Sequence, residues 1–337
     1  MSLFERDRSA ERLPVSVITG FLGSGKTTVL RHLLRQPGMG DSAVIVNELG
    51  EVGLDHLLLE RIEGETALLA SGCVCCALRG DLETTLRALL GRARRREIPA
   101  FRRVLVETTG VADPAPICQL LPNNPLVGRF YRLGAVLAAV DAVHARRQLE
   151  TRPEAVKQAA LADRLLVTKT DLAGEAESRA VGRRLAGLNP AAARLRVLHG
   201  VAEPDRLLGG DSFDPEGKTL DARRWLAAEA HDGAHGHHAP THDRIRSFAL
   251  TFDAPLAWPA VHDGLARLRT AHGERLLRVK GLLALEGVPG PVMVHGVHHI
   301  FHPPVELPAW PDGDRRSRLV FVTDGLERAT VEASLAG

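Results

Sequence analysis

Short runs of Val, Ile, Leu and Ala alternate with amphipathic stretches along the first two thirds of the chain. The hydrophobic runs are typical of buried strands and occupy Val15–Ile18, Ala43–Asn47, Val104–Glu107, Ala135–Val140 and Leu165–Thr168. Helical periodicity fills the stretches between them, at Thr27–Arg35, Leu82–Arg95, Ala142–Leu149, Pro153–Ala162 and Glu177–Gly187. This alternation predicts an α/β fold with a doubly wound, mostly parallel sheet. Ligands of such sheets bind beyond the carboxyl ends of the strands.

The pattern changes near residue 208, where a polar segment begins. Five histidines fall within His231–His242, which indicates either a weak metal-capturing arm or a linker in which histidines have accumulated. Beyond it, strand patterns and two helical patterns predict a smaller α+β layer of ferredoxin-like type. These strands are Arg246–Phe252, Leu276–Leu285, Val292–Val297 and Leu319–Val322, and the helices are Trp258–Leu268 and Leu326–Leu335. We therefore expect an α/β domain over 13–208, a linker over 209–243 and a second domain over 244–337.

The loop after the first predicted strand carries a phosphate-binding pattern. Residues 20–27, GFLGSGKT, match G-x-x-x-x-G-K-[ST] at every fixed position, between a predicted strand and a predicted helix. Glycines let backbone N–H groups turn around a phosphate, and the helix N-terminus adds partial positive charge. Lys26 is expected to reach the β- and γ-phosphates, and Thr27 to bind Mg²⁺. The predicted phosphate-binding set of this P-loop NTPase domain is Gly20, Gly23, Ser24, Gly25, Lys26, Thr27 and Thr28.

A second strand end carries an acid followed by a glycine. Residues 104–110, VLVETTG, resemble the Walker B and switch II region of GTPases. Glu107 is expected to hold Mg²⁺, directly or through water, and the amide of Gly110 to contact the γ-phosphate. Together with Lys26 and Thr27, Glu107 completes the set of predicted catalytic residues.

A third strand end points to the base of the nucleotide. Thr168-Lys169-Thr170-Asp171 matches the guanine-recognition pattern [NT]-K-x-D. Asp171 can accept hydrogen bonds from the ring N–H and the 2-amino group of guanine, whereas adenine has no such pair of donors. The pattern therefore favours GTP over ATP and argues against a P-loop kinase.

Three of the four cysteines are clustered. Cys73, Cys75 and Cys76 lie within four residues, and Cys118 stands alone. A disulfide between adjacent cysteines would be strained, and a structural zinc finger would usually need two separated pairs. Three thiolates with an open fourth position suit a borderline divalent ion such as Zn²⁺ or Co²⁺. The alternative is that these cysteines pack as small hydrophobic residues.

Taken in order, these motifs resemble a CobW-type member of the CobW/HypB/UreG family of metal-chaperone GTPases. The elements are GFLGSGKTT, VNELGEVGLD, GCVCC, ETTGVADP and TKTD, and LLRVKG at 276–281 resembles the second-domain motif of the family. The resemblance covers the chain from about residue 13 and implies a GTPase that binds zinc, or cobalt in some members, and delivers it to a client metalloprotein. Thr168 stands where Asn is commoner in the family.

The resemblance adds three candidate metal residues. Glu48 and Glu51 occupy a switch-I-like position, where they could report on Mg²⁺ or join the transferred metal. His144, which follows Asp141 at the end of a predicted strand, resembles a position near the metal region. From the residues alone, the two glutamates would belong to a solvated turn, and His144 would be a helix-capping histidine at the surface.

Composition limits the classes of partner that the chain is expected to bind. The 337 residues carry a net charge of +2, which implies no steering toward nucleic acid or an anionic membrane. No run reaches the ~18 apolar residues of a membrane-spanning helix, and the N-terminus lacks a secretory pattern, so we expect a cytoplasmic protein. The expected partners are GTP or GDP, a divalent metal ion and a client protein, with homo-oligomerisation left undecided. A regulatory or assembly GTPase without metal transfer and a metal-storage protein with weak nucleotide turnover remain as alternatives.

Overall fold

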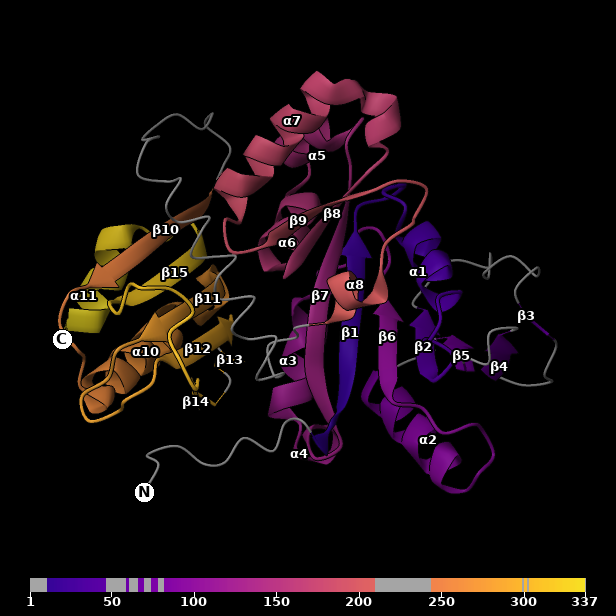
Figure 1. Ribbon diagram of the computed structural model, residues 1–337, viewed down its shortest axis with the longest axis horizontal. Coiled ribbons are helices and arrows are strands. Elements are labelled where there is room, and N and C mark those ends of the chain that lie inside the picture. Colours follow the sequence, from indigo (N-terminus) through magenta and orange to yellow (C-terminus); the bar gives the residue numbers. More distant parts are fainter. Residues whose placement is uncertain are drawn as a thin grey trace.

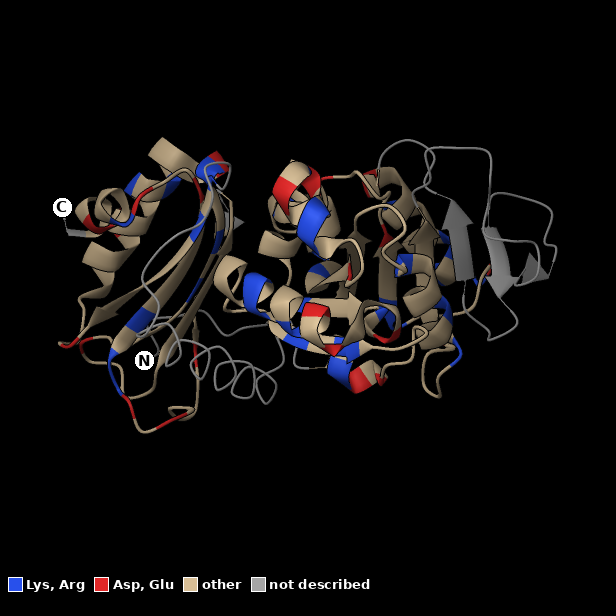
Figure 2. Cartoon of the chain, turned by 90° about the horizontal axis from the view of Figure 1, so that it is seen from above, with Lys and Arg blue, Asp and Glu red and all other residues tan. Residues whose placement is uncertain are grey.

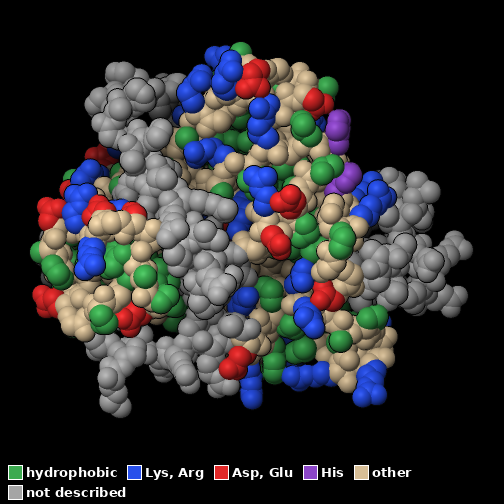
Figure 3. Space-filling view, in the orientation of Figure 1, with side chains coloured by type: hydrophobic (Ala, Val, Ile, Leu, Met, Phe, Trp, Pro, Cys, Tyr) green, Lys and Arg blue, Asp and Glu red, His purple; other side chains and the backbone are tan. Residues whose placement is uncertain are grey.

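The computed structural model describes residues 11–46, 59–60, 66–69, 74–77, 82–209, 244–298, 300–301 and 303–336. These residues form two sheets, each with its own helices, as Figure 1 shows. None of the helices within these ranges combines the length and the apolar character that a bilayer crossing demands. On the face seen in Figure 3, basic and acidic side chains of the described residues are interspersed.

The first sheet is the predicted doubly wound α/β sheet. Its strands lie in the order β3-β4-β5-β2-β6-β1-β7-β8-β9. All neighbours from β5 to β9 pair in parallel, whereas β3 and β4 pair antiparallel at one edge. The strand bounds are Leu13–Gly20 (β1), Ser42–Val46 (β2), Leu59–Glu60 (β3), Thr66–Leu69 (β4), Val74–Ala77 (β5), Arg103–Glu107 (β6), Tyr131–Asp141 (β7), Arg164–Thr168 (β8) and Ala193–Val197 (β9).

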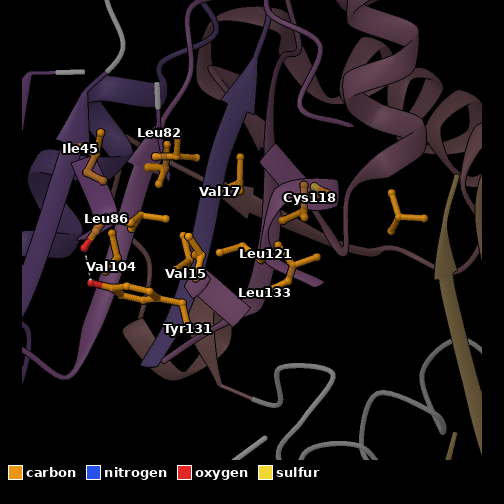
Figure 4. Close-up of a cluster of buried hydrophobic side chains, with 14 of the residues drawn as sticks. Val15, Val17, Ile45, Leu82, Leu86, Val104, Cys118, Leu121, Tyr131 and Leu133 are labelled. Carbon is orange, nitrogen blue, oxygen red and sulfur yellow. Dashed lines mark hydrogen bonds between the residues drawn. The ribbon is translucent and has the colours of Figure 1, made fainter. Parts of the chain in front are cut away.

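Helices cover both faces of this sheet because successive strand residues point to opposite sides. Val15 and Val17 pack with α2 and α3 in one buried cluster, which Figure 4 shows in close-up, and Ile18 packs with α1 in another. At the base of the first cluster, the Tyr131 hydroxyl donates to the Leu86 carbonyl at 2.9 Å. The helix bounds are Lys26–Leu34 (α1), Leu82–Arg94 (α2), Ala115–Asn123 (α3), Pro125–Gly128 (α4), Ala145–Thr151 (α5), Pro153–Leu161 (α6), Thr170–Leu188 (α7) and Pro204–Leu208 (α8).

Helix α3 and strand β9 were not predicted from the sequence, each for a physical reason, and α7 differs in extent from its predicted range. Helix α3 follows Pro114 and contains Pro122, so its prolines obscure a helical pattern that tertiary packing stabilises. Strand β9 reads ARLRV, and its arginines lie on the exposed side of an edge strand. Helix α7 starts directly after Lys169 but is broken at Gly174 (φ 76°, ψ 166°), so its longer second part starts close to the expected Glu177.

The second sheet is antiparallel, as the α+β prediction requires. Its order is β10-β15-β11-β12-β13, with β14 paired to β12. Helices α10 and α11 pack on one face in a shared hydrophobic cluster. The β10–α10–β11 connection is a split β-α-β unit, since β15 lies between its strands, and α11 follows β15 at the end of the chain. The bounds are Ile245–Phe252 (β10), Trp258–His272 (α10), Leu276–Leu283 (β11), Val292–Val297 (β12), Ile300–Phe301 (β13), Val305–Glu306 (β14), Ser317–Asp324 (β15) and Arg328–Ala336 (α11).

The other face of this second sheet packs against the α/β domain. Leu277, Val297 and Val322 join the cluster that contains Cys118 of α3 and Leu161 of α6. Figure 2 shows the second sheet standing between its own helices and the α/β domain. The two sheets are therefore joined by a continuous hydrophobic core.

Candidate functional site

The predicted nucleotide motifs converge because their strands are neighbours. Strands β6, β1, β7 and β8 are adjacent and parallel, so the loops after them emerge at one edge of the sheet. Figure 1 shows this edge at the top of β1, where the chain enters α1. The site is built on rigid strand ends, and the side chains that follow meet there.

The loop after β1 has the backbone that its glycines predict. Gly20, Gly23 and Gly25 have φ values of 138°, 72° and 89°, which residues other than glycine rarely adopt, and Gly25 immediately precedes α1. A Cβ at Gly20 would collide with the carbonyl of Ala139 on β7. Close backbone approach between β1 and β7 therefore also requires glycine here.

Lys26 folds over this loop. Its Nζ donates to the carbonyls of Gly20 at 2.8 Å and Phe21 at 3.2 Å. Burial lowers the pKa of Lys26, and the nearby Glu107 carboxylate opposes that shift. A cation held against carbonyl oxygens in a buried loop is ready to exchange these weak partners for phosphate oxygens.

Thr27, in the first turn of α1, meets Glu107 at the end of β6. The Thr27 hydroxyl donates to Glu107 Oε1 at 2.6 Å, and Glu107 is only 4% exposed. A hydroxyl and a buried carboxylate are hard oxygen ligands of the kind that Mg²⁺ takes beside phosphates. The residues predicted to hold the ion thus fit it.

The β6–α3 loop, residues 108–114, lies on the loop after β1. Thr108 donates to the Thr19 hydroxyl at 2.9 Å, and its backbone N–H donates to Ile18. At Gly110 an added Cβ would lie 2.6 Å from the Leu22 side chain and 2.7 Å from the Leu22 backbone nitrogen. Glycine is therefore required for the two loops to touch.

The guanine-recognition motif is tied to the phosphate loop by one hydroxyl. Thr168 Oγ1 donates to the Ser24 carbonyl at 2.8 Å. Lys169 has a left-handed backbone (φ 55°) and begins α7, while Asp171 is exposed in the first turn of that helix. The carboxylate of Asp171 is therefore open to solvent next to Lys169.

Asp141, at the end of β7, organises this side of the site and was not among the predicted site residues. Lys169 Nζ lies 2.7 Å from its carboxylate, His144 Nδ1 lies 3.0 Å away, and the Val143 amide donates at 2.9 Å. Burial raises the pKa of Asp141, but the hydrogen bonds from Lys169 and His144 hold it below the usual value. An acid at the end of a hydrophobic strand was the signal available in the sequence.

His144 and the cysteine strand lie on different parts of the sheet. The strand β5 carries Cys75 and Cys76, which pair in register with Val44 and Ile45 of β2. Strands β2, β6 and β1 stand between β5 and the end of β7, where His144 lies, a span of about 19 Å at ~4.8 Å per strand. The backbone therefore does not bring His144 beside β5.

The remaining metal candidates, Cys73, Glu48 and Glu51, lie outside the described residues, as does the His231–His242 tract. Within the described ranges no three His, Cys, Asp or Glu side chains form a metal-binding group. Cys118 is buried in α3, and burial raises the pKa of its thiol to about 12. Its role is hydrophobic packing, separate from the clustered thiols in the sequence.

Comparison with known proteins gives the following matches. The profile of the CobW/HypB/UreG nucleotide-binding domain matches residues 14–196, and that of the cobalamin synthesis protein cobW C-terminal domain matches residues 245–337. The chain is 34% identical over 328 residues to zinc chaperone YjiA of Escherichia coli (strain K12), covering 96% of this chain and 98% of the relative. It is 31% identical over 367 residues to zinc chaperone CobW of Pseudomonas aeruginosa, covering 97% and 92%. The crystal structure of Zn(II)-bound YjiA GTPase from E. coli superposes with a TM-score of 0.76 at 32% identity, covering 97% of this chain and 98% of that one.

Proposed function

The chain belongs to the CobW/HypB/UreG family, and from that premise we propose that it is a GTP-hydrolysing zinc chaperone. It binds Zn²⁺, or Co²⁺, at Cys73, Cys75 and Cys76 and transfers the ion to a client metalloprotein. The observation that supports this most directly is the convergence of Lys26, the Thr27–Glu107 pair and the TKTD motif at one sheet edge. The proposed domain limits are 13–208, 209–243 and 244–337.

The nucleotide roles follow from this geometry. The loop from Gly20 to Thr28 cradles the phosphates, and Lys26 moves from its loop carbonyls to the β- and γ-phosphates. Thr27 and Glu107 hold Mg²⁺, which when bound neutralises charge on the β- and γ-phosphate oxygens. Thr168 fixes the loop, Lys169 packs along the base and Asp171 accepts from guanine.

A short path in the sheet supports coupling between nucleotide and metal. Val46 of β2 is in register with both Glu107 of β6 and Ala77 of β5. Strand β5, which carries Cys76, is separated from β6 by β2 alone, so the backbones of β5 and β6 lie about 10 Å apart. Mg²⁺ and GTP held at Thr27 and Glu107 would tighten the thiolate site through the segment after β2, which carries Glu48 and Glu51, and loss of the γ-phosphate would loosen it. Thiolate ligands must lose protons to bind metal.

The test is Zn²⁺ and Co²⁺ affinity, measured by competition with a chromophoric chelator. It is repeated with Mg²⁺ and a GTP analogue, with Mg²⁺ and GDP, and without nucleotide. We expect the GTP-analogue state to bind metal at least ~10-fold more tightly, about 1.4 kcal/mol of coupling. Equal affinities in the three states contradict the switch, because a ligand without differential affinity shifts no equilibrium.

Three variants separate the two sites. Cys75→Ala is expected to weaken metal binding and spare nucleotide binding. Lys26→Ala is expected to abolish nucleotide binding and to affect metal only through coupling. Cys118→Ala is the matched control, because it removes a thiol that is buried in the core and should leave metal affinity unchanged. Loss of metal binding in Cys118→Ala would contradict the assignment of the site.

A further inference from the structure

We propose that Gln158 is a positioning residue for the β6–α3 loop and that the second domain holds Gln158 in place. The inference deepens the proposed function and rests on it. Gln158 lies in α6 and is 1% exposed. Its Nε2 donates to the carbonyls of Gly110 at 3.2 Å and Ala112 at 2.9 Å. Because both partners are acceptors, only the amide nitrogen can satisfy them, which fixes the orientation of the side chain.

These two hydrogen bonds determine how the loop presents its backbone. In a trans peptide the N–H points away from the preceding C=O, so fixing the Gly110 carbonyl toward α6 turns the Val111 N–H to the opposite side. Gly110 itself lies directly against Leu22 of the phosphate loop. Gln158 therefore sets the loop that is predicted to contact the γ-phosphate, without touching nucleotide itself.

The loop has a second tie to α6. Lys157 lies 3.6 Å from Asp113, and Asp113 accepts from the Ala115 amide at 2.9 Å, which starts α3. The loop is thus bracketed by α6 and α3, both of which contact the second sheet.

The second domain contacts the C-terminal end of α6. Arg278 of β11 donates to the Leu161 carbonyl and to Asp163, and Lys280 Nζ lies 2.9 Å from the same Asp163 oxygen. The other oxygen of Asp163 accepts from the Val136 amide of β7 at 2.9 Å. Displacing β11 would therefore pull on the helix that carries Gln158, three residues before Leu161.

The experiment compares Gln158→Met with Tyr131→Phe. Met keeps the length of Gln and removes the donor. Tyr131 is an equally buried donor, whose hydroxyl donates to the Leu86 carbonyl at 2.9 Å, outside both α6 and the β6–α3 loop. Affinities for a GTP analogue and for GDP, the GTP turnover number and the thermal midpoint are measured for both variants in the full chain.

We expect both variants to lower the thermal midpoint, but only Gln158→Met to lower the GTP-analogue affinity relative to GDP, by about fivefold or more, together with turnover. Gln158→Glu should do more, because a carboxylate would face two carbonyl oxygens. Equal loss for both nucleotides, or the same change in Tyr131→Phe, overturns the proposal. A wild-type chain that binds no guanine nucleotide would instead overturn the proposed function.

The role of the second domain is tested with Lys280→Met, which leaves Arg278 to hold Asp163. We expect Lys280→Met to lower the affinity for the GTP analogue relative to GDP, by less than Gln158→Met does. In the double variant with Gln158→Met the two shifts should combine non-additively, because they act through one helix. A GTP-to-GDP preference identical to wild type in Lys280→Met would show that the second domain does not hold Gln158.

Discussion

At the residue scale, Thr168 joins the two halves of the candidate nucleotide site through one hydroxyl. It stands where the family more often has Asn, and it donates to the Ser24 carbonyl and to the Val140 carbonyl, at 2.8 and 3.3 Å. A donor at this position thus links the base-recognition motif to the phosphate loop. The sequence pattern predicted Thr168 for the base, while its contact with Ser24 emerged only from the fold.

We expect Thr168→Val to weaken GTP and GDP binding to a similar degree, by about fivefold, because it removes one buried hydrogen bond worth about 1 kcal/mol. Fluorescent-nucleotide titration measures this. Thr168→Asn keeps a donor and serves as the control, which should bind almost as wild type. Wild-type affinity in Thr168→Val would mean that the hydroxyl does not support the site.

At the residue scale, some candidate site residues could be predicted from sequence motifs and others could not. Lys26, Thr27 and Glu107 stand at fixed spacings next to a strand, so their motifs predicted both the residues and their neighbourhood. Asp141 meets Lys169, and Gln158 meets Gly110 and Ala112, only through the fold. Nothing in the local sequence around Gln158 distinguishes it from any other polar residue of an amphipathic helix.

At the scale of elements, the contact between the β6–α3 loop and the phosphate loop depends on the absence of a side chain at Gly110. The strands and long helices around them were predictable because their hydrophobic periods are strong. Helix α3 and strand β9 were not, because prolines and arginines disguise them and packing decides their structure. The phosphate loop was recognised by its glycines. The β6–α3 loop that contacts it was recognised only by its resemblance to the switch II region of GTPases.

We expect Gly110→Ala to separate the two loops, since its Cβ would lie 2.6–2.8 Å from Leu22 atoms. Overpacking of this kind costs about 1–3 kcal/mol, so affinity for a GTP analogue should fall by roughly tenfold. Gly182→Ala in α7 is the matched control, because nothing lies within 4 Å of its added Cβ. Calorimetric titration of both variants checks this, and equal affinities would argue against a loop contact at the site.

At the scale of the whole molecule, a buried charge cluster joins the two domains. Asp163, Arg278 and Lys280 meet in the interface, with Asp163 and Arg278 almost fully buried. Burial raises the pKa of Asp163, but Arg278, Lys280 and His295 hold it well below its usual value. The sequence could not predict this pairing, because the partners are 115 residues apart and each reads alone as a surface charge.

We expect Asp163→Asn to destabilise the protein by about 3–5 kcal/mol at pH 7, because two buried cations lose their carboxylate. Since the folded pKa of Asp163 is depressed, its stabilisation is present above pH ~4 and is lost as the pH falls below that value. The difference in the free energy of unfolding between variant and wild type should therefore be smaller in acid. Urea unfolding at pH 7 and at pH 3.5 measures it.

Asp314→Asn is the control for this charge effect. Arg316 at the surface also lowers the pKa of Asp314, to about 2, but the pair is solvent-screened. The loss of unfolding free energy in Asp314→Asn should be far smaller than the loss in Asp163→Asn. Similar losses in the two variants would contradict a special role for the interface cluster.

The long separation of Asp163 from Arg278 also bears on synthesis. The ribosome makes the α/β domain first, and at about 5–20 residues per second the 115 residues to Arg278 take roughly 6–23 seconds. During that time the carboxylate of Asp163 and the apolar surfaces of α3 and α6 have no cover from β11. The nascent chain therefore passes through a stage in which this face is open to water, and the face closes only when the C-terminal sheet folds against it.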